Sequence, residues 1–319
     1  MKYRTAERQR TFIKLPAQLF ASLLLLCAML PVFSGCATAT SAEEYYSIGM
    51  SYFEMGKFEE AERWLTRALT TNRTMRASEY NLGRIAYETG RYTEASTIFK
   101  KILRKDPSNV LVLRAEAYTQ IKLGNIEEAG KTYKKVLDLE SDSLDDGFNY
   151  ALVLYAMDKP AEAEAELLKF DYNLLDNKDT LLLLARIQKA QDKLSAIDTY
   201  DQWLTKNTDP EVRYEYSVVL DKAGFYAKAL EQAQKVQLEL TADTETLKRY
   251  TVRFEVARLM LIADSEDTEG MTQLRQAIQE GFKDKEALNL LAKDEHIPKL
   301  LQEEIQRIND TDIPAAATP

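Results

Sequence analysis

One alanine recurs every 33 or 34 residues, and this period limits the fold more than any other feature of the chain. The recurring positions are Ala61, Ala95, Ala129, Ala163, Ala196 and Ala229. A turn residue stands five positions earlier at Gly56, Gly90, Gly124, Asp158 and Gly224, whereas the fifth repeat, shortened by one residue near Asp192, breaks this pattern. Two helices of roughly 12 to 14 residues and their turns occupy such a unit. We therefore expect helix pairs in which a glycine ends the first helix and the small alanine lets the second helix approach closely.

The repeated segments resemble tetratricopeptide repeats (TPRs), a family of stacked antiparallel helix pairs, over about residues 45–240. The first repeat carries the signature residues Tyr45, Ile48, Gly49, Tyr52, Gly56, Phe58, Ala61, Leu65 and Ala68. The second carries Leu82, Gly83, Gly90, Tyr92, Ala95, Phe99 and Pro107. Because one pair cannot bury its apolar face alone, successive pairs should stack. The resemblance implies an all-α fold, a TPR-like α-solenoid of about six to seven helix pairs with C-terminal capping helices.

The repeat array is placed at residues 43–241, and the pattern changes after it. Residues 242–308 keep a helical pattern while the signature fades, so we expect a degenerate seventh pair at 243–264 and 270–280 and then one or two closing helices. An atypical end of this kind covers the last apolar face of a solenoid. Residues 309–319 (NDTDIPAAATP) are predicted to form a disordered tail.

The N-terminus carries an export signal. Five basic residues and one acidic residue precede the apolar run at 15–33 (LPAQLFASLLLLCAMLPVF), so residues 1–35 are predicted to be a lipoprotein-type signal peptide. An uncleaved membrane anchor is the alternative, although Pro16, Gln18 and Pro31 interrupt the run. The part from 19 to 30 is also short for a membrane span, which needs about 20 residues.

The segment Phe33-Ser34-Gly35-Cys36 resembles the lipobox of bacterial lipoproteins, in which small residues precede a cysteine that becomes the lipidated N-terminus. The resemblance implies that Cys36 receives acyl chains such as palmitate, and that a short tether at 36–42 holds the repeats at a bacterial membrane facing the periplasm. More than one acyl chain is needed for stable anchoring. The A-x-A sequence at 37–39 offers an ordinary signal peptidase a competing site, and cleavage there would leave a soluble periplasmic or secreted protein.

Charge and residue usage exclude several classes of function. The chain has a formal charge of −9, and removal of residues 1–35 would change it to −13, so we expect no nucleic-acid partner. His296 is the only histidine, which excludes two-histidine metal sites and leaves Ser-His-Asp chemistry a single possible base. The acidic segment 140–147 (ESDSLDDG) lacks the spacing of a calcium loop and is predicted to be a solvated loop between repeats. We expect no enzyme, no catalytic residue, no cofactor and no metal.

In TPR proteins the first helix of each pair lines the concave face, so its side chains are the candidate partner-binding groove. Projected through the repeat, these positions are Tyr46, Met50, Phe53, Tyr80, Arg84, Tyr87, Arg114, Tyr118, Phe148, Asn149, Leu152, Tyr155, Arg186, Lys189 and Tyr214. Tyrosine and arginine provide large contact area with a polar end, which is typical of interaction hot spots. The alternative for each ring is packing between adjacent helices. Trp64 and Trp203 lie on second helices, where core packing or a place on the convex surface is expected. The paired Lys and Asn set with which some TPR proteins clamp chaperone tails is absent.

Two functions of different classes are compatible with these features. The leading hypothesis is a non-enzymatic, lipid-anchored scaffold that mediates protein–protein interaction with partners in the periplasm or cell envelope. The alternative is an accessory subunit of solute uptake that holds a small ligand, or docks a ligand-binding protein, in an aromatic channel with Arg84 and Arg114. A cavity closed on several sides would favour the small ligand, and an open groove would favour the scaffold. An enzyme would require carboxylates that converge in a pocket.

Overall fold

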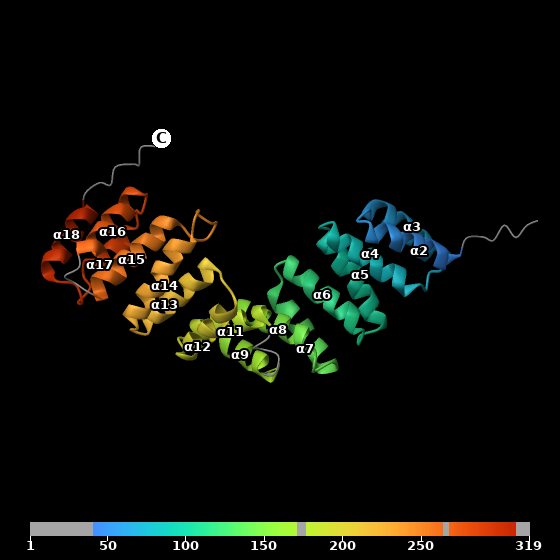
Figure 1. Ribbon diagram of the computed structural model, residues 1–319. Helices are drawn as coiled ribbons and strands as arrows, with labels where there is room; N and C mark the ends of the chain where they lie inside the picture. Colours follow the sequence, from blue (N-terminus) through green and yellow to red (C-terminus); the bar gives the residue numbers. More distant parts are fainter. Residues whose placement is uncertain (1–40, 171–176, 264–267, 311–319) are drawn as a thin grey trace, which may run out of the picture. The chain divides into compact units, whose positions relative to one another are not determined.

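The computed structural model describes residues 41–170, 177–263 and 268–310. Within these ranges the chain forms sixteen α-helices and one 3₁₀ helix, without a strand, so the all-α prediction is confirmed. The chain divides into two compact units, unit 1 up to Ile98 and unit 2 from Phe99 onward (Figure 1). The predicted signal peptide, Cys36 and most of the predicted tether and tail lie outside the described residues.

The helices alternate along the chain between the first and second members of successive pairs (Figure 1). The first helices are α2 (Ala42–Glu54), α4 (Arg76–Glu88), α6 (Val110–Lys122), α8 (Leu144–Ala156), α11 (Lys178–Ala190), α13 (Pro210–Lys222) and α15 (Arg249–Ala263). The second helices are α3 (Phe58–Thr71), α5 (Tyr92–Lys105), α7 (Ile126–Leu139), α9 (Pro160–Leu167), α12 (Ser195–Lys206), α14 (Tyr226–Glu239) and α16 (Thr268–Gln279). The 3₁₀ helix η2 (Leu168–Phe170) extends α9, and α17 (Lys285–Leu291) and α18 (Lys299–Asp310) follow the pairs.

Left-handed turn residues end the first helices, as the period predicts. The turn glycines with positive φ are Gly56, Gly90, Gly124 and Gly224, at 70° to 81°. Only glycine adopts this conformation without a steric cost. Asp158 takes it at φ 58°. All six period alanines are fully buried, which confirms the predicted close approach of the second helices.

The fifth repeat keeps a turn that the spacing had hidden. Asp192 has φ 53° and stands four residues before Ala196 instead of five. The Ala196 amide donates to the Lys193 carbonyl three residues back (3.1 Å), whereas the equivalent Ala61 amide donates to Lys57 four residues back (3.0 Å). A tighter, 3₁₀-type first turn of α12 therefore absorbs the missing residue. The predicted shortening near Asp192 thus changes the spacing of this repeat and keeps its turn.

The acidic segment 140–147 is a loop only in its first half. Helix α8 begins within it, after Ser143, whose hydroxyl accepts a hydrogen bond from the Asp146 amide (3.3 Å). Such a cap satisfies one of the amides that a helix start leaves without a partner. Asp146 is buried and binds Arg114. The prediction of a solvated loop is therefore wrong for its second half, which helps to join two repeats.

The cores of both units place a period alanine beside a large side chain of the same second helix. In unit 1, Ala61 and Leu65 of α3 pack with Ile85 of α4. In unit 2, Ala129 and Tyr133 of α7 pack with apolar residues of α6 and α8. Each cluster joins one pair to the first helix of the next. Stacking thus buries the apolar faces that a single pair would leave in water.

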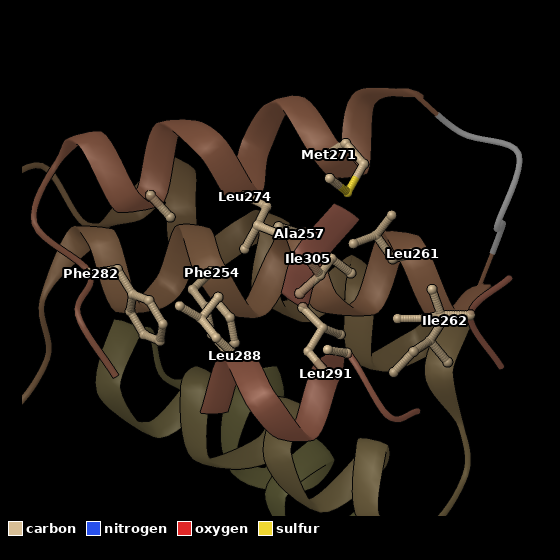
Figure 2. Close-up of a cluster of buried hydrophobic side chains, with 13 residues drawn as sticks. Phe254, Ala257, Leu261, Ile262, Met271, Leu274, Phe282, Leu288, Leu291 and Ile305 are labelled. Atoms are coloured by element: carbon tan, nitrogen blue, oxygen red, sulfur yellow. The ribbon is translucent and has the colours of Figure 1, made fainter. Parts of the chain in front are cut away.

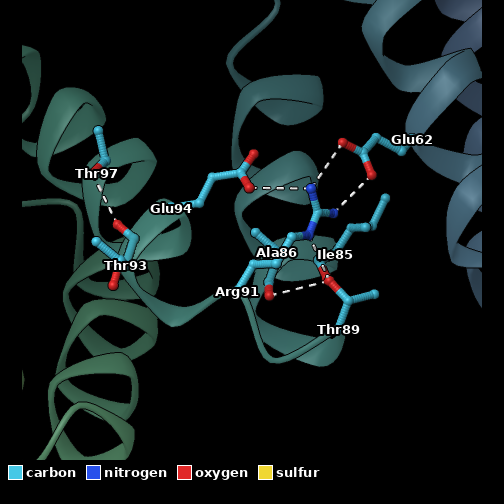
Figure 3. A network of polar contacts seen from close by, with 8 residues as sticks. All are labelled: Glu62, Ile85, Ala86, Thr89, Arg91, Thr93, Glu94 and Thr97. Carbon is cyan, nitrogen blue, oxygen red and sulfur yellow. Dashed lines mark hydrogen bonds and ion pairs between the residues drawn. The ribbon is translucent and has the colours of Figure 1, made fainter.

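A polar network in unit 1 also ties the first repeat to the second (Figure 3). Arg91 donates to both carboxylate oxygens of Glu62 at 3.2 and 2.7 Å and to Glu94 at 3.1 Å. Its Nε donates to the Thr89 hydroxyl (2.9 Å). Paired bonds between a guanidinium and a carboxylate fix orientation as well as distance. Because Glu62 belongs to α3 and Arg91 precedes α5, this pair fixes how the two repeats stack.

The C-terminal helices enclose a continuous apolar core in unit 2 (Figure 2). Phe254 of α15 stacks on Phe282, with ring centroids 4.0 Å apart. Leu274 of α16, Leu288 of α17 and Ile305 of α18 are buried in the same cluster. The seventh pair and two closing helices are thus present, and they bury one another's apolar faces.

The boundaries of the last helices differ from the predicted ones. Helix α15 begins at Arg249, six residues after the predicted start, because side chains bond the preceding backbone in a loop. The Asp243 carboxylate accepts from the Arg249 amide (2.9 Å), and the Thr244 hydroxyl accepts from the Leu247 amide (3.0 Å). Short polar side chains of this kind compete with helix formation. Helix α18 continues to Asp310, two residues into the predicted tail.

Candidate functional site

The predicted groove residues of unit 1 gather around Arg84. The guanidinium carbon of Arg84 lies 4.4 Å from the centroid of the Phe53 ring and 6.0 Å from that of Tyr80. One of its nitrogens donates to the Asn81 amide oxygen (3.2 Å), and the Asn81 amide nitrogen donates to the Tyr46 hydroxyl (3.2 Å). Aromatic faces attract a guanidinium through their quadrupole. This network joins α2 to α4 and holds a partly exposed cation over aromatic rings.

The other predicted residues of unit 1, Met50 and Tyr87, are also partly exposed. The Tyr87 ring meets Tyr92 edge-on, with centroids 5.4 Å apart. Met50 packs beside the core cluster of α3 and α4. These side chains contribute both to packing and to the accessible surface.

Two of the predicted groove residues of unit 2, Tyr118 and Leu152, are accessible to solvent. Tyr118 of α6 is 42% exposed and Leu152 of α8 is 43% exposed. The Tyr118 hydroxyl accepts from the Asn149 amide (2.8 Å), and its ring meets Tyr133 edge-on at 6.0 Å. Asn149 lies one helical turn before Leu152. The hydrogen bond therefore joins the exposed Tyr118 ring to α8, one helical turn before the exposed Leu152.

Arg114 is committed to contacts within the protein. Its Nε lies 2.9 Å from both carboxylate oxygens of Asp146, and its Nη2 lies 2.6 Å from both Asp146 and Glu140. Hydrogen bonding to Asp146, with a smaller contribution from Glu140, raises the pKa of Arg114 further above its ordinary value. The guanidinium thus links α6 to α8. Its donors already meet the protein's own carboxylates, which argues against the ligand-binding role expected for Arg114 in a solute-uptake subunit.

Two further predicted residues lie mainly between helices. Phe148 packs against the buried cluster that joins α8, α9 and α11. Tyr214 packs against the cluster that contains Val236, Leu247 and Val252. Burial, with a smaller contribution from Glu255, raises the pKa of Tyr214 to about 12. These two rings correspond to the packing alternative.

The last predicted positions, Tyr155, Arg186 and Lys189, meet in a hollow of about 760 Å³ formed by α8, α11, α13 and the start of α12. The other lining residues are Ala190, Asp192, Lys193, Leu194, Ile197, Glu215, Val218, Val219, Lys222 and Ala223. Ligand pockets in proteins occupy about 300 to 1,000 Å³ and combine apolar walls with a few polar groups. The hollow has both properties, and three successive first helices contribute to it.

Glu215 of α13 holds Arg186 in place within this hollow. The Nε and Nη2 atoms of Arg186 donate to the two Glu215 oxygens at 3.1 and 2.8 Å, and the Tyr200 hydroxyl donates at 2.8 Å. Burial by itself raises the pKa of Glu215, but the hydrogen bonds from Arg186 and Tyr200 outweigh it and lower the pKa below its ordinary value. Burial and the nearby Glu215 charge raise the pKa of Tyr200. The pair is therefore fixed in its ionised form.

The Lys222 side chain of the hollow is more accessible than the Arg186–Glu215 pair. Lys222 binds Asp192, and both side chains are more than half exposed. Lys189 lies 3.7 Å from Glu215. Exposed ion pairs of this kind contribute about 0 to 1 kcal/mol. Lys222 could therefore exchange Asp192 for a group of a bound molecule at little cost.

Sequence reasoning missed several residues of the hollow. Val218 stands six positions before Gly224, as Met50 stands before Gly56, so the turn register could have indicated it. Leu194 is 67% exposed and follows the shortened turn at Asp192. Nothing in the repeat pattern indicates Leu194, because its position depends on the tighter first turn of α12, which compensates for the missing residue of this repeat.

The only histidine of the chain does not line the hollow. His296 is exposed, and its Nδ1 lies 2.8 Å from an Asp294 carboxylate oxygen. Its ring meets Tyr226 edge-on at 5.4 Å. Over the described ranges, no group of three or more His, Cys, Asp or Glu side chains could hold a metal ion. Over the same ranges, none of the helices has the length and apolar character to span a membrane.

Comparison with known proteins recognises the repeats. Two family models, both described as tetratricopeptide repeat, match residues 46–110 and 112–143. Among solved structures, a tetratricopeptide repeat protein from Parabacteroides merdae has a TM-score of 0.55 at 16% identity and covers 85% of this chain and 99% of its own. Pseudomonas aeruginosa pilF has a TM-score of 0.51 at 19% identity and covers 62% and 90%. The chain thus carries TPRs, and its fold is a TPR-like solenoid.

Two proteins with similar sequences have different names, one a lipoprotein and the other a transferase. An uncharacterized lipoprotein of Treponema pallidum is 22% identical over 161 residues, which are 50% of this chain and 82% of the relative. Protein O-mannosyl-transferase Tmtc3 of Drosophila melanogaster is 26% identical over 171 residues, which are 49% of this chain. That match spans only 18% of the transferase. TPRs are consistent with a scaffold for protein–protein interaction.

Proposed function

We propose that the chain is a non-enzymatic, lipid-anchored TPR scaffold that binds a partner protein in the periplasm or envelope of a bacterial cell. Three findings support the proposal: the lipobox-like segment that ends at Cys36, a relative named as a lipoprotein, and the recognised TPRs. The transferase relatives do not favour an enzyme, because the matched segment is a small part of their length. Fold by itself does not define function, which depends on the geometry of a site.

The observation that carries the proposal is the surface of unit 2 formed by Tyr118, Leu152 and the adjoining hollow. Tyr118 and Leu152 stay accessible at equivalent positions of consecutive first helices, which supports an interaction site on this face. The Tyr118–Asn149 hydrogen bond and the Arg186–Glu215 pair hold this surface in one arrangement before a partner binds. A surface that is already ordered loses less conformational entropy on binding.

Site-specific crosslinking tests the partner site. A photoreactive amino acid at position 152 should crosslink to one defined protein in intact cells. The same group at position 131, an exposed position on helix α7, serves as the matched control and should not crosslink to that protein. Equal yields at both positions would reject the first-helix surface as the partner site.

The anchor is tested separately. Cys36→Ala should abolish acylation and release the protein from membranes, because no other cysteine follows the apolar run. Mass spectrometry of the mature N-terminus provides the measurement. A mature chain that begins at Thr40 without acyl mass would contradict the anchor and favour a soluble periplasmic protein.

The accessory role in solute uptake is the second candidate, and the hollow is the observation that favours it. Its volume of about 760 Å³ would admit a small molecule, and Arg186 and Lys189 could contact an anionic group. Native mass spectrometry of the purified protein tests this role. A stoichiometric small molecule that is lost in Arg186→Gln would favour uptake, whereas an empty protein that still crosslinks at position 152 would favour the scaffold.

A further inference from the structure

The first repeat presents an aromatic cluster on the side away from the second repeat. The Tyr45 ring of α2 stacks on the Trp64 ring of α3, with centroids 5.8 Å apart and planes 28° apart. The guanidinium carbon of Arg67 lies 4.8 Å from the Tyr45 centroid and 6.0 Å from the Trp64 centroid. We call Tyr45, Trp64 and Arg67 the end cluster. Both rings are partly exposed, and Arg67 is exposed.

The opposite sides of α2 and α3 face the second repeat. Met50 of α2 and Phe58 of α3 pack against the core cluster that contains Ile85 of α4. Glu62 of α3 binds Arg91 from the same side (Figure 3). Residues on a helix are 100° apart, so Trp64 lies about 200° around α3 from Glu62. The end cluster therefore lies on the side of the first repeat that faces away from the second repeat, and no other repeat of the described chain covers that side.

The corresponding positions of the second repeat carry no aromatic ring. Thirty-four residues after Tyr45 stands Glu79, and thirty-four residues after Trp64 stands Ile98. A solenoid in water normally ends in a polar face, because a terminal repeat has no neighbour to cover apolar groups. Here two stacked aromatic rings stand at that end. Their chemistry suits a boundary that is neither fully apolar nor fully aqueous.

The place of the end cluster in the chain indicates which boundary this is. The described chain starts at Ser41, five residues after Cys36, and five residues span at most about 18 Å. Tryptophan and tyrosine are enriched at the headgroup level of membranes, where their apolar rings and polar groups are both accommodated. An arginine beside them can extend its guanidinium to lipid phosphates while its stem stays among apolar groups.

We propose that the end cluster docks into the lipid headgroup region of the membrane that holds the acyl anchor, so that the first repeat rests on the bilayer. This inference rests on the proposed anchoring at Cys36. Docking through rings as well as acyl chains would hold the first repeat in one orientation at the membrane. The N-terminal end of the scaffold that carries the partner-binding residues would then be fixed on the bilayer and not only tethered to it.

Tryptophan fluorescence tests the docking directly, because the chain contains two tryptophans. The purified acylated protein is reconstituted into phosphatidylethanolamine–phosphatidylglycerol vesicles with and without lipids that carry a quencher near the headgroup. Trp64 should contact the quencher and lose emission. Trp203 is buried within unit 2, where its indole N–H donates to the Lys178 carbonyl (2.9 Å), and should lose none.

The matched control is Trp64→Phe, which removes the reporter and leaves Trp203 and every core residue of unit 2 unchanged. Quenching in the wild type and none in Trp64→Phe would support the docking. Equal quenching of both chains, or no quenching while the protein co-floats with the vesicles, would overturn it and leave the anchor standing. A protein that carries no acyl chain and does not co-float would overturn the anchor, and the docking with it.

Discussion

Leu152 and Leu154 allow the proposed partner surface to be tested with one substitution at two positions of the same helix. Leu152 is 43% exposed, at the position of α8 that corresponds to Tyr118 of α6, whereas Leu154 is 4% exposed in the core cluster of α8, α9 and α11. Replacing each by alanine removes the same atoms. The two sites differ only in whether those atoms pack inside the protein or remain available to a partner.

The structure gives different magnitudes for the two substitutions. Leu154→Ala should lower the free energy of unfolding by about 2 to 5 kcal/mol, because it removes buried methyl groups and leaves a cavity. Leu152→Ala should lower it by only about 1 kcal/mol, because much of that side chain is already in water and no enclosed cavity forms. If Leu152 is a hot spot, its truncation should weaken partner binding by about 2 kcal/mol, which is about 30-fold in Kd.

Urea unfolding and titration of the partner identified by crosslinking provide both measurements, with affinity expressed per folded molecule. Leu152→Ala should bind weakly and unfold almost like the wild type, and Leu154→Ala should show the reverse. If Leu152→Ala destabilised the protein as much as Leu154→Ala, the side chain would belong to the core. If neither variant lost affinity, the surface at Leu152 would not be the partner site.

Two further predictions concern packing and pH. Gly49→Ala should destabilise the protein by about 1 to 2 kcal/mol, because the added Cβ would lie 2.8 Å from Leu65 Cγ and 3.1 Å from its backbone nitrogen. In Gly130→Ala the added Cβ would mainly meet the flexible Met157 sulfur at 3.2 Å, so this variant should instead be stabilised by up to about 1 kcal/mol through its higher helix propensity. Thermal unfolding measures both variants, and equal effects would contradict the close packing described at Gly49. The pKa of Tyr214 is raised from its ordinary value near 10 to about 12, so the stability that it contributes should persist below pH 10 and be lost between pH 10 and 12. Tyr214→Phe should therefore show a shallower loss of stability over that pH range in urea titrations, and an unchanged slope would show that the phenol is not buried as described.

The sequence by itself determined the repeat architecture. The alanine period and the turn glycines predicted the helix pairs, and all six alanines are fully buried. This succeeds because a TPR array is built from contacts within one pair and with the next pair, so each contact recurs in the sequence at the same spacing. The same register places Tyr118 and Leu152 on equivalent positions of consecutive first helices.

Only the tertiary structure decided which of the predicted side chains are available to a partner. In the sequence, Arg114 and Arg186 cannot be distinguished from arginines that are free to bind a partner. In the structure their guanidinium groups are held by Asp146 and Glu215, which lie on the first helix of the next repeat. The turn at Asp192 was hidden for a similar reason, because its shortened repeat is absorbed by a tighter helical turn rather than by a change of residue type. Periodicity records what every repeat shares. The pairing of individual side chains across repeats is specific to each site, and it becomes visible only when the neighbouring helices are in place.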